Sequence, residues 1–73
     1  MSVYHLKLLE RRWSLVHAST GSVLSRFKSF REAVPQSAAD VARRHGCLVV
    51  YRRDGSILEW RRFAEAAPAS PLS

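Results

Sequence analysis

The N-terminal third of the chain alternates apolar and polar side chains with the period of two that is typical of half-buried β-strands. Residues 3–9 place Tyr4, Leu6 and Leu8 on one face, and residues 13–17 likewise place Trp13, Leu15 and His17 on one face. A loop over residues 9–12 would join these strands as a hairpin, because it pairs Leu8 with Trp13 and brings both apolar faces to the same side. The pattern therefore predicts an antiparallel pair at the start of the chain.

The next segment predicts a turn, a short strand and the start of a helix. Residues 19–21 combine Ser, Thr and Gly, which favour a turn, and residues 23–27 predict a third strand. Ser29 and Glu32 have the spacing of a capping box, in which the serine oxygen accepts a hydrogen bond from an unpaired backbone amide. A helix is therefore predicted to begin at Ser29.

Apolar residues continue at helical spacing from Phe30 to Val41, and Gly46 is well placed to end the helix in the left-handed conformation. Pro35 interrupts this pattern. Proline has no amide for the hydrogen bond to the carbonyl of Arg31, and its ring crowds that turn. We therefore expect a kink, or a restart with Pro35 in the first turn of the main helix.

The C-terminal part of the chain carries the clearest hairpin signal. Two strand-forming segments, residues 47–51 and 57–63, flank an Asp-Gly turn at 54–55. A two-residue loop would pair Tyr51 with Leu58 and Val49 with Trp60 on one face of the hairpin. The sequence therefore predicts two further antiparallel strands after the helix.

This register divides the hairpin into two faces. One face carries Val49, Tyr51, Leu58 and Trp60. The other carries Leu48, Val50, Arg52, Ile57, Glu59 and Arg61. Because the charged side chains share the second face, we expect that face to meet water.

These elements predict an α+β fold, in which an antiparallel sheet of four to five strands has one helix packed on one face. Residues 1–63 would form a single domain. Residues 64–73 consist mostly of Ala, Ser and Pro and are predicted to form a flexible C-terminal tail. A single helix would leave the opposite face of the sheet open.

This open face is the predicted partner-binding surface, because an apolar stripe flanked by arginines is suited to docking a protein. The predicted contact residues are Leu48, Val50, Arg52, Ile57, Arg61 and Arg62. We expect the protein to act as a monomer, while an exposed edge strand leaves dimerisation open.

The composition of the chain narrows the function classes. Twelve Lys and Arg outnumber six Asp and Glu for a net charge of +6, which favours polyanions or acidic protein surfaces as partners. No spacing of His, Cys and carboxylates assembles a nucleophile with its base or a metal site, so we expect no enzymatic activity, metal or cofactor. We expect a cytoplasmic location. The single cysteine, Cys47, cannot form an internal disulfide, and the pattern contains no signal peptide or membrane span.

Arginine dominates the basic residues. Ten of the twelve are Arg, and eight of these occur as doublets. On a strand the two members of a doublet point to opposite faces, so the positive charge is spread around the fold. This distribution supports an alternative function, an arginine-rich module that binds nucleic acid. Trp13 and Trp60 are assigned to the core, because each shares a face with other large apolar residues.

Several motifs together resemble a family of small bacterial and phage domains of unknown function, with a strand, a second strand, a capped helix and a D-G hairpin. They are Tyr4-His5-Leu6, Trp13-Ser14-Leu15, Phe27 to Ala33 with its capping box, Leu48-Val49-Val50-Tyr51 and Asp54-Gly55-Ser56-Ile57. Pro35 in the helix and the density of arginine depart from this pattern. Over its whole length, the chain looks more closely like the small RNA-polymerase-binding transcription regulators of lytic Xanthomonas phages.

This second resemblance implies a phage-encoded regulator that binds the catalytic β and β′ subunits of host bacterial RNA polymerase. It further implies interference with the sigma factor during initiation and antitermination during elongation. Contact with nearby nucleic acid in the transcription complex is left open. The resemblance identifies no binding residues, so the predicted surface rests on the open-face argument.

Overall fold

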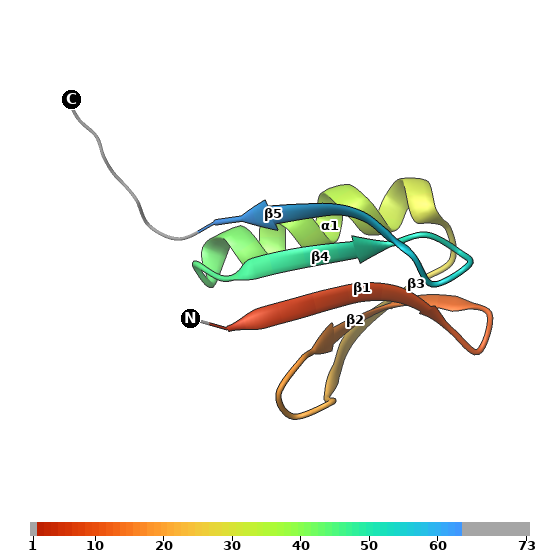
Figure 1. Ribbon diagram of the computed structural model, residues 1–73, viewed down its shortest axis with the longest axis horizontal. Coiled ribbons are helices and arrows are strands. Elements are labelled where there is room, and N and C mark those ends of the chain that lie inside the picture. The colour runs from red at the N-terminus through yellow and green to blue at the C-terminus, as the bar shows by residue number, and fades with distance from the viewer. Residues whose placement is uncertain (1, 64–73) are drawn as a thin grey trace.

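The computed structural model describes residues 2–63, and the predicted tail at 64–73 lies outside the described residues. The elements are β1 (Val3–Leu9), β2 (Arg12–His17), β3 (Val23–Phe27), α1 (Phe30–Arg43), β4 (Cys47–Tyr51) and β5 (Ile57–Arg62). The helix α1 packs against one face of the five-stranded sheet, where it contacts β1 to β4 (Figure 1). This arrangement confirms the predicted α+β fold.

The sheet is mixed, with the strand order β3-β2-β1-β4-β5. The two central strands, β1 and β4, run parallel, so the prediction of a wholly antiparallel sheet is wrong for this pair. The helix explains the difference. It carries the chain from β3, at one edge of the sheet, back to the start of β4 beside β1, and such crossovers are how parallel strands are joined.

The first hairpin has the predicted register, in which Leu8 pairs with Trp13. The first strand has the predicted bounds and the second begins one residue earlier, at Arg12, because the connection is a two-residue turn rather than a loop over 9–12. The turn residues, Glu10 and Arg11, both have left-handed backbones, with φ of 51° and 68°. Positive φ at both positions matches the type I′ turn, whose twist suits antiparallel strands.

Each edge strand contains one extra residue relative to its neighbour. In β3 this residue is Leu24, and in β5 it is Leu58. The second irregularity pairs Tyr51 with Ile57 in place of the predicted Leu58, while Val49 pairs with Trp60 as predicted. Bulges twist and interrupt edge strands, which makes them poorer templates for aggregation. They also turn both leucines toward the side of the sheet that carries α1.

The helix begins as predicted, with Ser29 as the N-cap. The Ser29 Oγ accepts a hydrogen bond from the backbone N–H of Glu32 over 3.2 Å. The helix then continues through Pro35, so the predicted restart does not occur. Pro35 lies on the exposed side of α1, where water can replace the hydrogen bond that the proline ring removes.

The end of the helix differs from the prediction in one respect. The left-handed residue is His45, with φ of 56°, and not Gly46. The amide of Gly46 donates to the carbonyl of Val41 over 3.2 Å, which is the bond of a Schellman motif. Gly46 is needed for close packing instead, because an added Cβ would lie 2.8 Å from the carbonyl oxygen of Ser2 and 2.9 Å from Tyr4 Cε1.

The core lies between the helix and the face of the sheet that the helix covers. It consists of Tyr4, Leu6, Trp13, Leu15, Phe27, Ala33, Val41, Leu48 and Val50. Leu48 and Val50 are fully buried, so the prediction that they lie on the open face is wrong. The prediction assumed that the face with Glu59 and Arg61 meets water. These two residues do share the helix-facing side with Leu48 and Val50, but β5 is an edge strand, so Glu59 and Arg61 remain in contact with water there.

Candidate functional site

The sheet face opposite α1 carries a row of residues that crosses all five strands, and this face is termed the open face. The strand registers align Val23, Val16, His5, Val49 and Trp60, one from each strand from β3 to β5. Paired residues on neighbouring strands point to the same face of a sheet. The row therefore forms a continuous band across the open face.

The band is apolar and exposed at both ends. Trp60 is 63% exposed and Val23 is 41% exposed, whereas Val16 and Val49 are buried between them. Ile57, opposite Tyr51 on the same face, is 51% exposed. Large exposed apolar side chains that lie together mark interaction surfaces, and tryptophan often dominates the binding energy at such surfaces.

Basic side chains flank the band. Lys7 and Arg26 are register partners of Ser14, and Arg62 is the partner of Cys47, which places all three basic residues on the open face. The acidic residues of the described chain lie elsewhere, in turns (Glu10, Asp54), on α1 (Glu32, Asp40) and on the helix-facing side of β5 (Glu59). Within the described part of the chain, the open face therefore presents only positive charge around its apolar band.

His5 adds a third aromatic ring to this face. Its ring packs edge-on against Tyr51, with 5.2 Å between ring centroids. Burial, with a smaller contribution from the charge of Lys7, lowers the pKa of His5 below its usual value. His5 is therefore neutral at pH 7, which keeps the centre of the band uncharged.

Two of the predicted contact residues, Ile57 and Arg62, lie on the open face. Arg52 lies in the connection between β4 and β5, where its guanidinium donates to the carbonyl of Ile57 over 3.1 Å. Arg61 lies on the helix-facing side of β5 and forms an ion pair with Glu59. The structure therefore distributes the predicted arginines over different surfaces, while the two buried predicted residues, Leu48 and Val50, are inaccessible to a partner.

Sequence reasoning missed Trp60, Tyr51 and His5 as residues of the open face. The signal for them was present, because the predicted register already placed Trp60 opposite Val49. Alternation along the first strand likewise separated His5 from the core residue Leu6. The missing information was which face of the sheet the helix covers.

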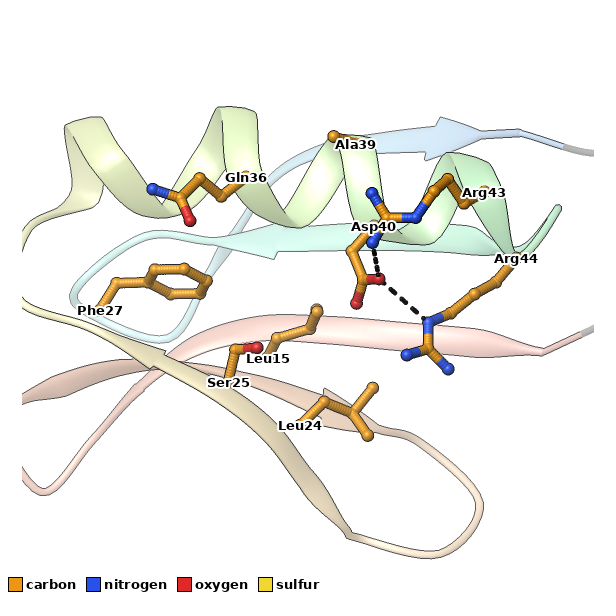
Figure 2. Close-up of a pocket in the computed structure, with 9 residues that line it drawn as sticks. All are labelled: Leu15, Leu24, Ser25, Phe27, Gln36, Ala39, Asp40, Arg43 and Arg44. Atoms are coloured by element: carbon orange, nitrogen blue, oxygen red, sulfur yellow. Dashed lines mark hydrogen bonds and ion pairs between the residues drawn. The ribbon is translucent and has the colours of Figure 1, made fainter.

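Two hollows flank the helix on the other side of the sheet. The larger, of about 440 Å³, lies between α1 and the β2–β3 hairpin and is bordered by the bulged residue Leu24 (Figure 2). Asp40 projects toward this hollow and accepts hydrogen bonds from Arg43 over 2.7 Å and from Arg44 over 3.3 Å. The carboxylate of Asp40 therefore neutralises about half of the positive charge that the two arginines bring to this hollow.

The smaller hollow, of about 260 Å³, lies at the other end of the helix. It is lined by Trp13, Phe30, Arg52, Arg53 and Leu58, and it is termed the Trp13 groove. Its floor is apolar because the rings of Trp13 and Phe30 pack with centroids 4.7 Å apart. It is separate from the open face, because its walls are built on the helix-covered side of the sheet.

Within residues 2–63, no group of three or more His, Cys, Asp or Glu side chains could hold a metal ion. In the same part of the chain, no helix has the length and apolar character needed to cross a membrane. Comparison of the chain with protein-family models, with curated proteins and with solved structures found no match.

Proposed function

We propose that this protein is a non-catalytic regulator that binds bacterial RNA polymerase through the open face of its sheet. The observation that carries the proposal is an apolar band that ends at Trp60 and that, among residues 2–63, is flanked only by positive charge. The resemblance of the chain to polymerase-binding phage regulators supports the choice of partner. On this proposal the protein acts in the bacterial cytoplasm, contacts the β and β′ subunits, opposes sigma-dependent initiation and promotes antitermination.

The open face has the features of a docking surface for an acidic protein region. Trp60 offers a large rigid contact area beside Val49, and aromatic residues of this kind contribute most of the binding energy at many interfaces. Lys7, Arg26 and Arg62 at its border would steer the protein toward carboxylates and exclude basic surfaces. Stoichiometric occupation of a polymerase surface by this face needs no catalytic group.

The test is the affinity of the full chain for purified bacterial core RNA polymerase, measured by biolayer interferometry. Trp60→Ala is expected to weaken binding by at least about tenfold, because the loss of a hot-spot residue costs roughly 2 kcal/mol or more. Leu24→Ala is the matched control, since Leu24 is also an exposed apolar residue of an edge strand but borders the hollow beside α1. Its affinity is expected to stay unchanged.

A charge-reversal pair tests the basic border of the same face. Arg62→Glu should weaken binding, whereas Arg31→Glu on the exposed surface of α1 should have a smaller effect. The same variants should lose inhibition of promoter-dependent transcription and readthrough of a terminator in parallel with affinity. Unchanged polymerase binding in both Trp60→Ala and Arg62→Glu would reject the open face as the docking surface.

A second candidate function is supported by the aromatic character of the same face. Trp60, Tyr51 and His5 lie on a positively charged sheet surface, and unpaired bases stack on such side chains in proteins that bind single-stranded nucleic acid. This function predicts that fluorescein-labelled single-stranded RNA binds the protein without polymerase, with affinity that falls steeply with salt and with Trp60→Ala. Absence of RNA binding at physiological salt would exclude it.

A further inference from the structure

The Trp13 groove has an apolar floor and walls that are open to an incoming side chain. Trp13 is almost fully buried and forms the floor with Phe30, while Leu58 is 41% exposed and forms a wall. Leu58 reaches this side of the sheet because it is the extra residue of the β5 bulge. A cavity of roughly 150 Å³ holds a benzene ring, so about 260 Å³ accommodates an aromatic or leucine side chain.

The border of the groove carries two arginines, and the charge of the nearby Asp54 carboxylate offsets only part of theirs. The guanidinium of Arg52 is held by Ser56 Oγ at 3.3 Å and by the carbonyl of Ile57, both uncharged groups. Arg53 makes no hydrogen bond or ion pair with any other residue in the part of the chain that the structure describes. The groove therefore differs from the hollow in Figure 2, where one carboxylate forms ion pairs with both arginines.

The nearby carboxylate of Asp54 is engaged by a different partner. Its Oδ1 accepts hydrogen bonds from the backbone N–H of Ser56 over 2.9 Å and from Ser56 Oγ over 2.7 Å. These hydrogen bonds, the backbone one first, lower the pKa of Asp54. Asp54 thus stabilises the connection between β4 and β5. Its charge also acts on Arg52, but in the described part of the chain it forms no hydrogen bond or ion pair with Arg52 or Arg53, so both guanidinium groups stay open to an external anion.

We propose that the Trp13 groove binds an acidic segment of a partner protein, which inserts one aromatic or aliphatic side chain against Trp13 and Phe30. Carboxylates next to that side chain pair with Arg52 and Arg53, because the planar fork of arginine matches a carboxylate. A nucleobase fits the same hollow less well. Its N–H donors would be buried without partners, because Phe30 and Leu58 are apolar and the arginines are themselves donors only, and this costs free energy.

This site goes beyond the proposed function, because it lies on the opposite side of the sheet from the open face. Binding at the two sites can be measured separately, because Trp13 lines the groove and Trp60 lies on the open face. In ¹⁵N NMR spectra of the full chain, each indole N–H gives its own signal. The two signals therefore report on the two surfaces in one titration.

The experiment titrates ¹⁵N-labelled protein with a synthetic peptide that has a central Leu-Phe flanked by Asp and Glu. The expected result is a shift of the Trp13 indole signal with little change at Trp60. Arg53→Glu should reduce the affinity for this peptide by about tenfold or more, because it replaces an attraction with a repulsion. Arg31→Glu, an exposed arginine on α1 outside the groove, is the control and should change the affinity far less.

Two comparison ligands complete the test. A peptide with Lys in place of every acidic residue, and one with Ala in place of Leu-Phe, should each fail to shift the Trp13 signal. The proposal is overturned if the acidic peptide leaves Trp13 unperturbed, if it shifts only Trp60, or if a short single-stranded RNA shifts Trp13 at lower concentration. Polymerase binding by Trp60→Ala is an independent readout, so failure of this site is distinguishable from failure of the open face.

Discussion

Paired truncations of Leu48 and Ile57 test which face of the sheet is buried. Both residues are predicted contacts, and both substitutions to Ala remove the same number of carbon atoms. Leu48 has no exposed surface, so Leu48→Ala deletes packed atoms and leaves a cavity, which costs about 2.7–5 kcal/mol. Ile57 is 51% exposed, and the loss of half-buried methylene groups at about 0.8 kcal/mol each gives a cost of about 1 kcal/mol.

Thermal and urea unfolding followed by circular dichroism measure this difference. In a domain of this size, 1 kcal/mol shifts Tm by about 4–8 °C, so Leu48→Ala should lower Tm by at least about 10 °C and Ile57→Ala by about 4–8 °C. Ile57→Ala should weaken partner binding while the fold remains intact. Equal losses of stability in the two variants, or a larger loss for Ile57→Ala, would refute the assignment of faces.

Three further predictions concern the helix end and the open face. Gly46→Ala should destabilise the fold by about 1–3 kcal/mol in urea unfolding because its Cβ would overlap Tyr4, and a variant as stable as the wild type would contradict this packing. His45→Gly should raise stability by about 0.5–1 kcal/mol, since glycine adopts φ of 56° without strain; a lower Tm would count against it. The pKa of His5 is lower in the folded protein than in the unfolded chain, so protons bind the unfolded state more readily and the free energy of unfolding should fall as the pH decreases below about 6.5. His5→Gln should reduce this loss of stability between pH 7 and pH 5. An unchanged pH profile in the variant would contradict this role of His5.

Local patterns in the sequence were sufficient to predict most of the elements. The first hairpin was predictable because a single register, with Leu8 opposite Trp13, joins the apolar faces of both strands. The start of the helix was predictable because the Ser29 hydroxyl satisfies a specific backbone amide. These features depend on neighbours within a few residues, so the chain itself carries the information.

Features that depend on distant segments were not predictable in the same way. The parallel pairing of β1 with β4 arises from the helical crossover, and alternation within either strand does not specify the direction of its neighbour. The choice of buried face in β4 was also undetermined, since Leu48 and Val49 are both apolar. The charges of β5 were a poor guide, because an edge strand keeps Glu59 solvated even on the side that carries the helix.

The candidate site changed with the choice of face. Leu48 lies beneath the helix, so its neighbour Val49 must lie on the open face. The register that was predicted from sequence pairs Val49 with Trp60, which places Trp60 on the open face and not in the core. Bulges were not predicted, and the one in β5 explains why Ile57 stays on the open face while its neighbour Leu58 lines the Trp13 groove. Turn and strand signals alone do not show where an extra residue is inserted.

The most direct test of the open face is hydroxyl-radical footprinting of the full chain with and without saturating bacterial core RNA polymerase, read by mass spectrometry. Trp60 is exposed and reactive in the free protein, while fully buried Leu48 is an unreactive internal reference. Our account predicts that polymerase protects Trp60 and Tyr51 and leaves Leu24 as reactive as before. Unchanged modification of Trp60 in the saturated complex, together with protection of Leu24, would contradict it.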